Sequence, residues 1–413
     1  MNPHFILSPL REALGYLLVG VWLGYIGYRL EYYRQPVWLY IALILKVVAA
    51  WIFAGVYAHY YKGWGDTVAA YLAVRQITHY FLQNPLDGIA LLFREFSPAL
   101  YRRGAEIAAQ DSIGLDYEVE LTDPTNYFFY RLLFPIYLAA GGSYYGMQGI
   151  MGLIGGLLSY AAYQRWASLI QFPRRFYLFW FFLPSSLFWT SGALRDTLAF
   201  PLTLYGAAWI ASVYQRREIW KLFLFLFLYF LRPESCFLAI GVGLWYRWSH
   251  WKGLFPLSIA LSIPLLGFYL GPWAYAHRVE ALQLITYPPH HSPSAFHLDY
   301  APTFWGSWVG WLKALPLGLV GPPVWQSQKP FVFLYTLEGW ALIGLSLVPG
   351  IGKEWNRQAL ILTGIGIFVI GVTTMAMPFW GNLARYKLYG IYFIALGLAT
   401  LEERAQKDKH GTS

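Results

Sequence analysis

The sequence predicts an all-α polytopic transmembrane protein, and two observations support this. Hydrophobic residues make up 57% of the 413 residues and charged residues only 12%, whereas soluble domains carry roughly 25% charged residues. Apolar runs of about 20 residues, the length that crosses a bilayer as a helix, recur along the chain. We therefore expect one integral-membrane domain, residues 1–413, with about 11–13 membrane helices and interfacial amphipathic helices in two long loops.

Charge, cysteine content and repeats exclude other classes. The net charge of +9 arises from Lys and Arg in short loops between apolar runs, where such residues set membrane topology, so it does not indicate nucleic-acid binding. The single cysteine, Cys236, excludes an internal disulfide and a thiolate metal cluster. No repeat with a period of about 20–50 residues is visible, so a duplicated transporter architecture has no support.

The apolar runs predicted to cross the membrane lie at about 13–29, 36–57, 127–141, 147–163, 176–190, 197–213, 254–272, 331–349, 358–377 and 385–401. The second run holds Lys46, which must face protein or extend to the interface because a charge within the membrane is costly. Residues 222–246 are interrupted by Arg232-Pro233-Glu234, so we predict two half-helices whose break lies in a protein-lined site. The tail after residue 401 is expected to be disordered and cytoplasmic.

Two long loops separate the groups of spans. The first loop, 58–126, has amphipathic helical spacing at 67–82 and 86–97, which predicts helices lying in the membrane interface. The second loop, 273–330, lacks a clean period apart from the apolar stretch 303–320, and we expect it to cover the substrate site. A patch in this loop, His290-His291 with His297 and Asp299, could bind metal, although its spacing matches no zinc signature. The alternative is that these are ordinary loop histidines.

The stretch around Asp66 stands where the second apolar run ends, and it contains Gly63, Trp64 and Gly65. A carboxylate there can act as general base toward an acceptor hydroxyl, or it can hold a divalent cation, the only cofactor that the sequence suggests. Glycines permit close approach of a ligand to the backbone, and Trp64 offers a flat surface for a sugar or lipid. The alternative interpretation is that Asp66 is only the N-cap of the helix that follows.

Three further places put charges at helix ends or breaks, and they are Arg195 with Asp196, Arg232 with Glu234, and Arg385 with Lys387. Charges beside membrane helices are expensive and are usually functional or paired. The cations can hold the phosphate of a polyprenyl-phosphate sugar, which Arg binds in bidentate geometry. The alternatives are structural. Arg195 with Asp196 would only start a capped helix, Arg232 with Glu234 would lie in a solvated turn, and Arg385 with Lys387 would anchor the chain at the membrane interface.

Several motifs resemble those of integral-membrane glycosyltransferases of the GT-C type. They are Gly65-Asp66-Thr67 with Tyr71, Pro124-Thr125-Asn126-Tyr127, the turn Gly141-Gly142-Ser143, and the run from Ser191 to Thr197. More closely, the chain is similar to uncharacterised bacterial polysaccharide-assembly membrane proteins. That likeness rests on a Ser-Gly-x-x-(Lys/Arg)-(Asp/Glu) step, an Arg-Pro break between short helices, a glutamate like Glu338 in a late helix, and a final Asn-x-x-Arg-Tyr.

The resemblance implies an enzyme of the bacterial inner membrane that transfers a sugar from a polyprenyl-phosphate donor. The transfer would invert the configuration at the anomeric carbon of the sugar and would occur outside the cytoplasm. It would belong to cell-surface glycan or polysaccharide assembly. The partners would be the lipid-linked sugar and membrane lipid. Asp66 takes the role of base or metal ligand, and Arg195 or Arg385 that of phosphate binding. The alternatives are a polysaccharide polymerase or lipid-linked glycan transporter, and a non-catalytic membrane subunit of a larger complex.

Topology sets a condition on a shared site. If every apolar run crosses once, Asp66 lies on the side of Arg174-Arg175 and Arg216-Arg217, which the positive-inside rule makes cytoplasmic. The sites at Arg195-Asp196 and Arg385 then face the other side. A common active site therefore requires that one run does not cross fully, and the short pieces at 127–163 and 176–190 are the candidates.

Overall fold

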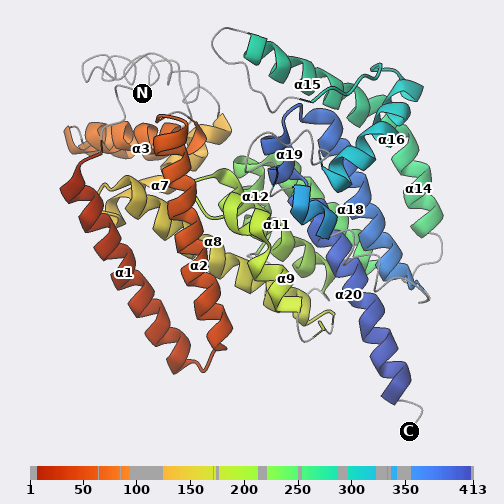
Figure 1. Ribbon diagram of the computed structural model, residues 1–413, viewed down its shortest axis with the longest axis horizontal. Helices are drawn as coiled ribbons and strands as arrows, with labels where there is room; N and C mark the ends of the chain where they lie inside the picture. The colour runs from red at the N-terminus through yellow and green to blue at the C-terminus, as the bar shows by residue number, and fades with distance from the viewer. Residues whose placement is uncertain are drawn as a thin grey trace. The chain divides into compact units, whose positions relative to one another are not determined.

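The computed structural model describes residues 7–63, 65–83, 85–93, 124–170, 172–173, 176–212, 221–249, 254–286, 296–321, 333, 336–341 and 355–410. Within these ranges the chain is helical and contains no strand (Figure 1), which confirms the all-α class for this part of the protein. Three described helices are long and apolar enough to cross a membrane, namely Pro9–Tyr32, Val37–Tyr60 and Arg357–Ala376. Two shorter apolar helices cover Leu222–Leu231 and Leu388–Leu401.

The chain divides into two compact units. Unit 1 contains Met1–Gln164, Ser186–Gly206 and Tyr214–Ala239, and unit 2 contains Arg165–Ser185, Ala207–Val213 and Ile240–Ser413. Because the chain passes repeatedly from one unit to the other, neither unit corresponds to a continuous segment of the sequence.

Unit 1 begins with a helical hairpin of α1 (Pro9–Tyr32) and α2 (Val37–Gly55), which η1 (Val56–Tyr60) extends as one turn of π-helix (Figure 1). Pro9 stands at the first helical position, where its missing N–H leaves no hydrogen bond unmade. The other helices wholly or partly in unit 1 are α3 (Asp66–Gln83), α4 (Pro85–Phe93), α7 (Pro124–Ala139), α8 (Tyr144–Ala167), α10 (Pro184–Trp189), α11 (Arg195–Ala211), α12 (Leu222–Leu231) and α13 (Pro233–Arg247).

A row of glycines on α8 allows other helices of unit 1 to pack against its backbone. A Cβ on Gly149 would lie 2.9 Å from a methyl carbon of Val19, and one on Gly152 would lie 2.9 Å from the Lys46 carbonyl oxygen. A Cβ on Gly155 would lie 2.7 Å from a methyl carbon of Thr197. Side chains are therefore excluded where α1, α2 and α11 meet α8, and close backbone contact of this kind is typical of packed membrane helices.

Gly152→Ala is expected to lower the free energy of unfolding by about 1–3 kcal/mol, because overpacking forces backbone shifts of that cost. The added methyl group meets the Lys46 carbonyl and the Ala50 side chain. Gly20→Ala is the matched control, since nothing lies within 4 Å of a Cβ at Gly20. Urea unfolding in detergent, followed by tryptophan fluorescence, measures both variants, and equal stabilities would contradict the packing argument.

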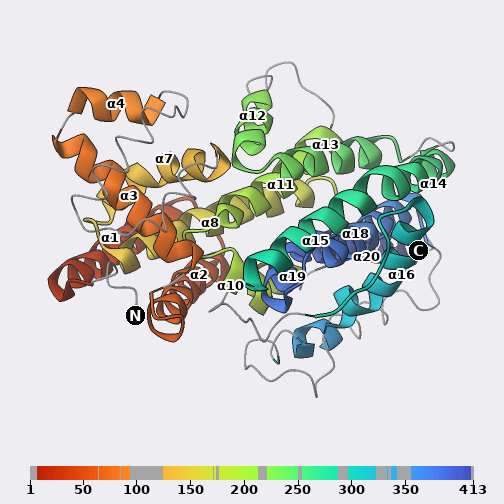
Figure 2. The same ribbon diagram turned by 90° about the horizontal axis from the view of Figure 1, so that it is seen from above.

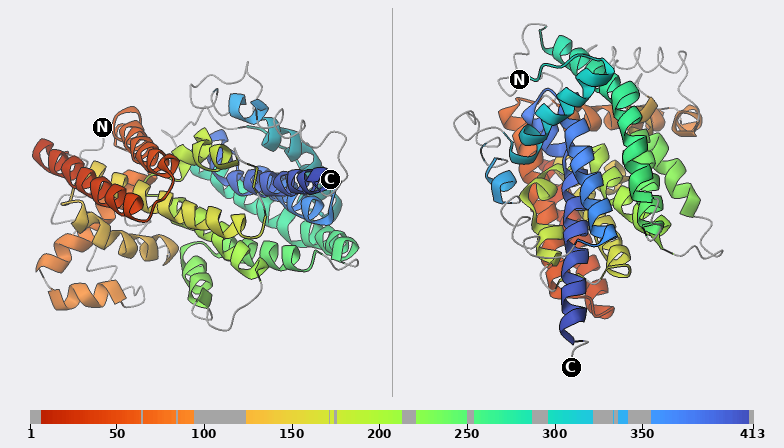
Figure 3. Two further views of the ribbon diagram at one scale, coloured as in Figure 1. Left: turned by 90° about the horizontal axis from the view of Figure 1, so that it is seen from below. Right: turned by 90° about the vertical axis from the view of Figure 1, so that its right-hand side faces the viewer.

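Unit 2 contains α9 (Phe176–Phe182), α14 (Leu254–Pro264), η4 (Leu265–Leu270), α15 (Gly271–Thr286), α16 (Phe304–Val320), α18 (Arg357–Ala376), α19 (Trp380–Tyr386) and α20 (Leu388–His410). Helix α18 packs against α15, α16 and α20, and Figure 3 shows α18 and α20 side by side. Asn356 caps α18 by accepting from the Ala359 amide at 2.7 Å. The buried core between these helices includes Leu266, Ala274, Ala314 and Met375.

Arg278 fixes the start of the segment Phe296–Tyr300 within unit 2. Its buried guanidinium donates to the carbonyl oxygens of Met377, at 3.1 Å, and of Phe296. The Phe296 amide donates to the Pro378 carbonyl at 2.9 Å, and its ring stacks on Trp380 with centroids 4.3 Å apart. Part of the loop predicted at 273–330 is therefore held against the end of α18, and its role as a cover over substrate remains a prediction.

The structure confirms several predicted elements. Helices α1, α2 and α18 coincide with the runs at 13–29, 36–57 and 358–377. The predicted break at Arg232 is also confirmed, because α12 ends at Leu231 and α13 begins at Pro233, with extended backbone at Arg232 (φ −164°, ψ 96°). Figure 2 shows the two helices running in different directions.

Two predictions about these elements are wrong. The run 176–190 contains two helices of 7 and 6 residues rather than one span, because Pro184 starts a new helix. Helix α15 covers much of the start of the second long loop, as far as Thr286, and the bounds of that loop stay a prediction. The tail after 401 is not disordered over its whole length: α20 continues to His410, through Ala, Glu, Arg, Gln and Lys, which favour helix.

Candidate functional site

Asp66 is the first residue of α3 and is exposed to solvent. Gly65, not Asp66, precedes the helix, and its carbonyl accepts the first helical hydrogen bonds, from Val68 at 3.1 Å and Ala69 at 3.0 Å. The N-cap interpretation of Asp66 is therefore wrong. As an acid in the first turn, Asp66 still gains from the positive end of the helix dipole, an effect of about 0.3–1 kcal/mol.

The glycines beside Asp66 serve the turn between η1 and α3. Lys62 and Gly63 have φ values of 55° and 82°, and Gly65 has 114°, a region in which L side chains are strained. A Cβ on Gly65 would also collide with the Tyr57 ring. The close approach that the sequence suggested for a ligand is thus made by Tyr57. Trp64 lies outside the described residues.

The Asp66 motif is joined to the α7–α8 turn within unit 1. The Thr67 and Tyr144 hydroxyls lie 2.9 Å apart, and the Tyr71 hydroxyl donates to the Gly142 carbonyl at 3.2 Å. Burial raises the pKa of the Tyr71 hydroxyl, which keeps it protonated as a donor. Two motifs that are distant in sequence, Gly65-Asp66-Thr67 and Gly141-Gly142-Ser143, therefore lie in one hydrogen-bonded region. It includes η1, a type of π-helical turn frequent at functional sites.

Glu12 holds this region together, and the sequence reasoning missed it. The buried carboxylate accepts from the Ser143 hydroxyl at 2.6 Å and from the amides of Tyr144 and Tyr145 at 3.2 and 3.0 Å. Those amides belong to the first turn of α8, where a negative charge is favoured. The sequence did contain a signal for Glu12, namely a glutamate in an otherwise apolar helix. A charge in such a helix is costly unless it has a partner.

Glu12→Ala is expected to lower the free energy of unfolding by about 2–4 kcal/mol, because three donors lose a charged acceptor. Glu31→Ala on the same helix is the matched control, since Glu31 is exposed and surface substitutions change stability by about 0.5 kcal/mol or less. Unfolding in detergent compares the two variants, and equal effects would show that the Glu12 contacts contribute little.

Lys46 faces protein within α2, as the sequence predicted. The residue is 2% exposed, and its ammonium donates to the carbonyl oxygens of Ser186 and Thr190, at 3.1 and 3.2 Å, and to the Thr190 hydroxyl. The cation thus lies at the C-terminal end of α10, where the helix dipole favours positive charge. It fixes the turn Thr190–Leu194, which leads directly into Arg195 and Asp196 at the start of α11.

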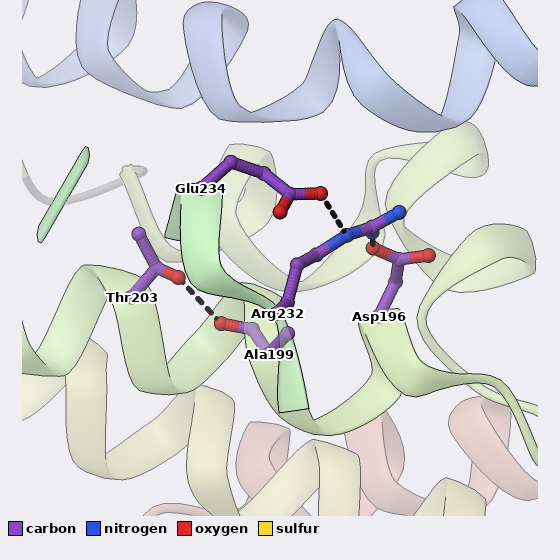
Figure 4. A network of polar contacts seen from close by, with 5 residues as sticks. All are labelled: Asp196, Ala199, Thr203, Arg232 and Glu234. Carbon is purple, nitrogen blue, oxygen red and sulfur yellow. Dashed lines mark hydrogen bonds and ion pairs between the residues drawn. The ribbon is translucent and has the colours of Figure 1, made fainter. Parts of the chain in front are cut away.

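Asp196, Arg232 and Glu234 form a cluster in unit 1 (Figure 4). Arg232 pairs through Nη1 with Asp196, and its Nε donates to Glu234 Oε1 at 3.0 Å. The side chains of Arg232 and Asp196 are 5% and 3% exposed, whereas that of Glu234 is 64% exposed. Two places that the sequence singled out separately are therefore brought together, and one end of the cluster is open to solvent. Arg195, beside Asp196, is half-buried.

The late charged residues lie in unit 2. Glu338 Oε2 accepts from the backbone amide and the hydroxyl of Ser185 at 2.9 and 2.6 Å, and Lys387 is the cation that acts on Glu338 electrostatically. Lys387 and Arg385 are 2% and 7% exposed. Because Asp66 belongs to unit 1 and Arg385 to unit 2, a site shared by Asp66, Arg195 and Arg385 remains a prediction.

Among the residues that the structure describes, no group of three or more His, Cys, Asp or Glu side chains could hold a metal ion. His290 and His291 lie outside the described residues, while His297 and Asp299 are described and exposed. The role of Asp66 as a metal ligand stays a prediction. No protein-family model, no curated protein and no solved structure matches the chain.

Proposed function

We propose that the protein is a GT-C-type glycosyltransferase of the bacterial inner membrane, with about 11–13 membrane helices, which transfers a sugar from a polyprenyl-phosphate donor during cell-surface glycan assembly. The acceptor hydroxyl attacks the anomeric carbon as the bond from that carbon to the phosphate oxygen breaks. Polyprenyl phosphate leaves with the bonding electrons, and the hydroxyl proton passes to Asp66. Arg195 and Arg385 hold the phosphate in this mechanism, and Trp64 contacts the sugar or lipid.

The position of Asp66 carries this proposal. It is an exposed carboxylate six residues beyond the candidate membrane helix that ends at Tyr60. It begins α3 without serving as its N-cap, because Gly65 accepts the first helical hydrogen bonds. A general base must reach its proton within hydrogen-bonding distance, and an exposed residue at the interface can meet both a lipid donor and an acceptor.

The length of α9 and α10 supports a site on one side of the membrane. These helices have 7 and 6 residues, and at 1.5 Å per residue each is about 10 Å long, against about 30 Å of hydrocarbon. The run 176–190 is one of those that must not cross fully if Asp66 is to share a side with Arg195. A failure of this run to cross would place Arg195 on the same side of the membrane as Asp66.

The test is release of free polyprenyl phosphate by the purified protein in liposomes. The assay uses a panel of labelled polyprenyl-phosphate sugars with a lipid-linked glycan extract as acceptor source, and it reports the reaction whichever sugar is used. We expect release coupled to labelled product. Absence of release with every donor, from protein shown to be folded, would contradict the proposal.

A lipid-linked glycan transporter is a second candidate, favoured by the broken helix at Arg232 and its buried ion pair. Broken helices with buried charges line substrate paths in many transporters. The two functions separate in the same liposomes. A transporter moves a fluorescent polyprenyl-phosphate sugar across the bilayer without cleaving its phosphate ester, whereas a transferase releases polyprenyl phosphate.

A further inference from the structure

The guanidinium of Arg232 has two carboxylate partners of different kinds. Asp196 is buried, and breaking a buried ion pair by removing one partner is strongly destabilising. Glu234 is 64% exposed on its side chain, and exposed ion pairs contribute little to stability. Asp196 is therefore a permanent partner of Arg232, and Glu234 is one that a ligand can replace.

We infer that Arg232 is a phosphate-binding site, in which an incoming phosphate displaces Glu234 from the Nε edge of the guanidinium. Arg binds phosphate with two parallel N–H···O bonds, and these charge-assisted bonds are stronger than a solvated carboxylate pair. The displaced Glu234 carboxylate loses its contact with Arg232, and its side chain is exposed. Asp196 acts as a positioning residue that holds the guanidinium while its other edge changes partners.

The local backbone makes the exchange possible. Arg232 is the single extended residue between α12 and α13, so its side chain is held at a helix break and not within a helix face. Its carbonyl accepts from the amides of Ser235 and Cys236, at 3.1 and 3.3 Å, which caps α13 without help from the Glu234 side chain. Glu234 can thus leave Arg232 without a loss of helix structure.

The ligand is a phosphate monoester or diester, and it can come from a polyprenyl-phosphate lipid or from free phosphate. The assignment of the lipid rests on the proposed function, whereas the phosphate site itself does not. The inference thus adds Arg232 to Arg195 and Arg385 as a residue that binds phosphate. It also gives Glu234 an unusual property, since removing its charge is expected to strengthen ligand binding.

The experiment measures the affinity of the full-length protein in nanodiscs for farnesyl phosphate and for inorganic phosphate. Glu234→Gln is expected to bind phosphate about two- to fivefold more tightly than the wild type, the factor that corresponds to an exposed ion pair. Arg232→Lys, which keeps the charge but loses the fork, is expected to bind at least about tenfold more weakly. Glu31→Gln makes the same charge change at an exposed site on α1, and it is expected to leave affinity unchanged.

Unchanged or weaker binding in Glu234→Gln would overturn the inference, even if Arg232→Lys fails to fold. A gain shared by Glu31→Gln would also overturn it, because net charge alone would then explain the effect. Tighter binding of farnesyl phosphate than of inorganic phosphate supports a lipid ligand, and equal binding supports free phosphate. If no sugar transfer is found while Glu234→Gln still tightens binding, the proposed function fails and the phosphate site stands.

Discussion

Asp66→Asn is expected to lower sugar transfer from polyprenyl phosphate by about 100- to 10,000-fold, the range for loss of a general base. Asn keeps the size and shape of Asp but cannot accept the proton of the attacking hydroxyl. Folding should change little, since Gly65 precedes the helix and accepts its first hydrogen bonds. The lost interaction with the helix dipole amounts to about 0.3–1 kcal/mol.

The assay for Asp66→Asn combines release of polyprenyl phosphate with an unfolding curve in detergent. Asp299→Asn is the matched control, because Asp299 is also an exposed aspartate and has no part in the proposed reaction. Full activity in Asp66→Asn, at unchanged stability, would reduce Asp66 to a structural residue. Activity restored by Asp66→Glu would support a carboxylate role.

Asp196→Ala is expected to destabilise the protein by about 3–5 kcal/mol, the cost typical of breaking a buried ion pair by removing one partner. The side chain of Arg232 is 5% exposed, so most of its surface stays buried when Asp196 is removed. Glu234→Ala should cost less than about 1 kcal/mol, because that side chain is mostly exposed. Comparing the stability losses of Asp196→Ala and Glu234→Ala tests whether Asp196 is the permanent partner of Arg232 and Glu234 the replaceable one.

A double-mutant cycle separates the pair from its surroundings. Asp196→Ala combined with Arg232→Met removes both charges, and buried ion pairs replaced by apolar residues are often as stable as the original. We therefore expect the double variant to be more stable than Asp196→Ala alone, a strong departure from additivity. Additive losses in urea unfolding would show that the two side chains stabilise the fold independently.

The sequence alone determined the helical class and the approximate place of most helices. Apolar runs of membrane length gave α1, α2 and α18, because burial of apolar residues is a local compositional signal. The break at Arg232-Pro233 was also local, since proline lacks an N–H and restricts the residue before it. The predicted span at 176–190 was wrong, because Pro184 stands within apolar sequence and begins a new helix there.

The tertiary structure alone decided which charged residues are partners. Asp196 and Arg232 are 36 residues apart, and Glu12 and Ser143 are 131 apart, and no pattern in the sequence fixes such pairs. The structure also shows that Gly65, not Asp66, is the N-cap of α3. It shows that Gly63 and Gly65 have the positive φ values that the turn before α3 requires. The physical reason is that burial of a charge is tolerated only with a partner, and the fold as a whole decides which side chain is close enough to be that partner.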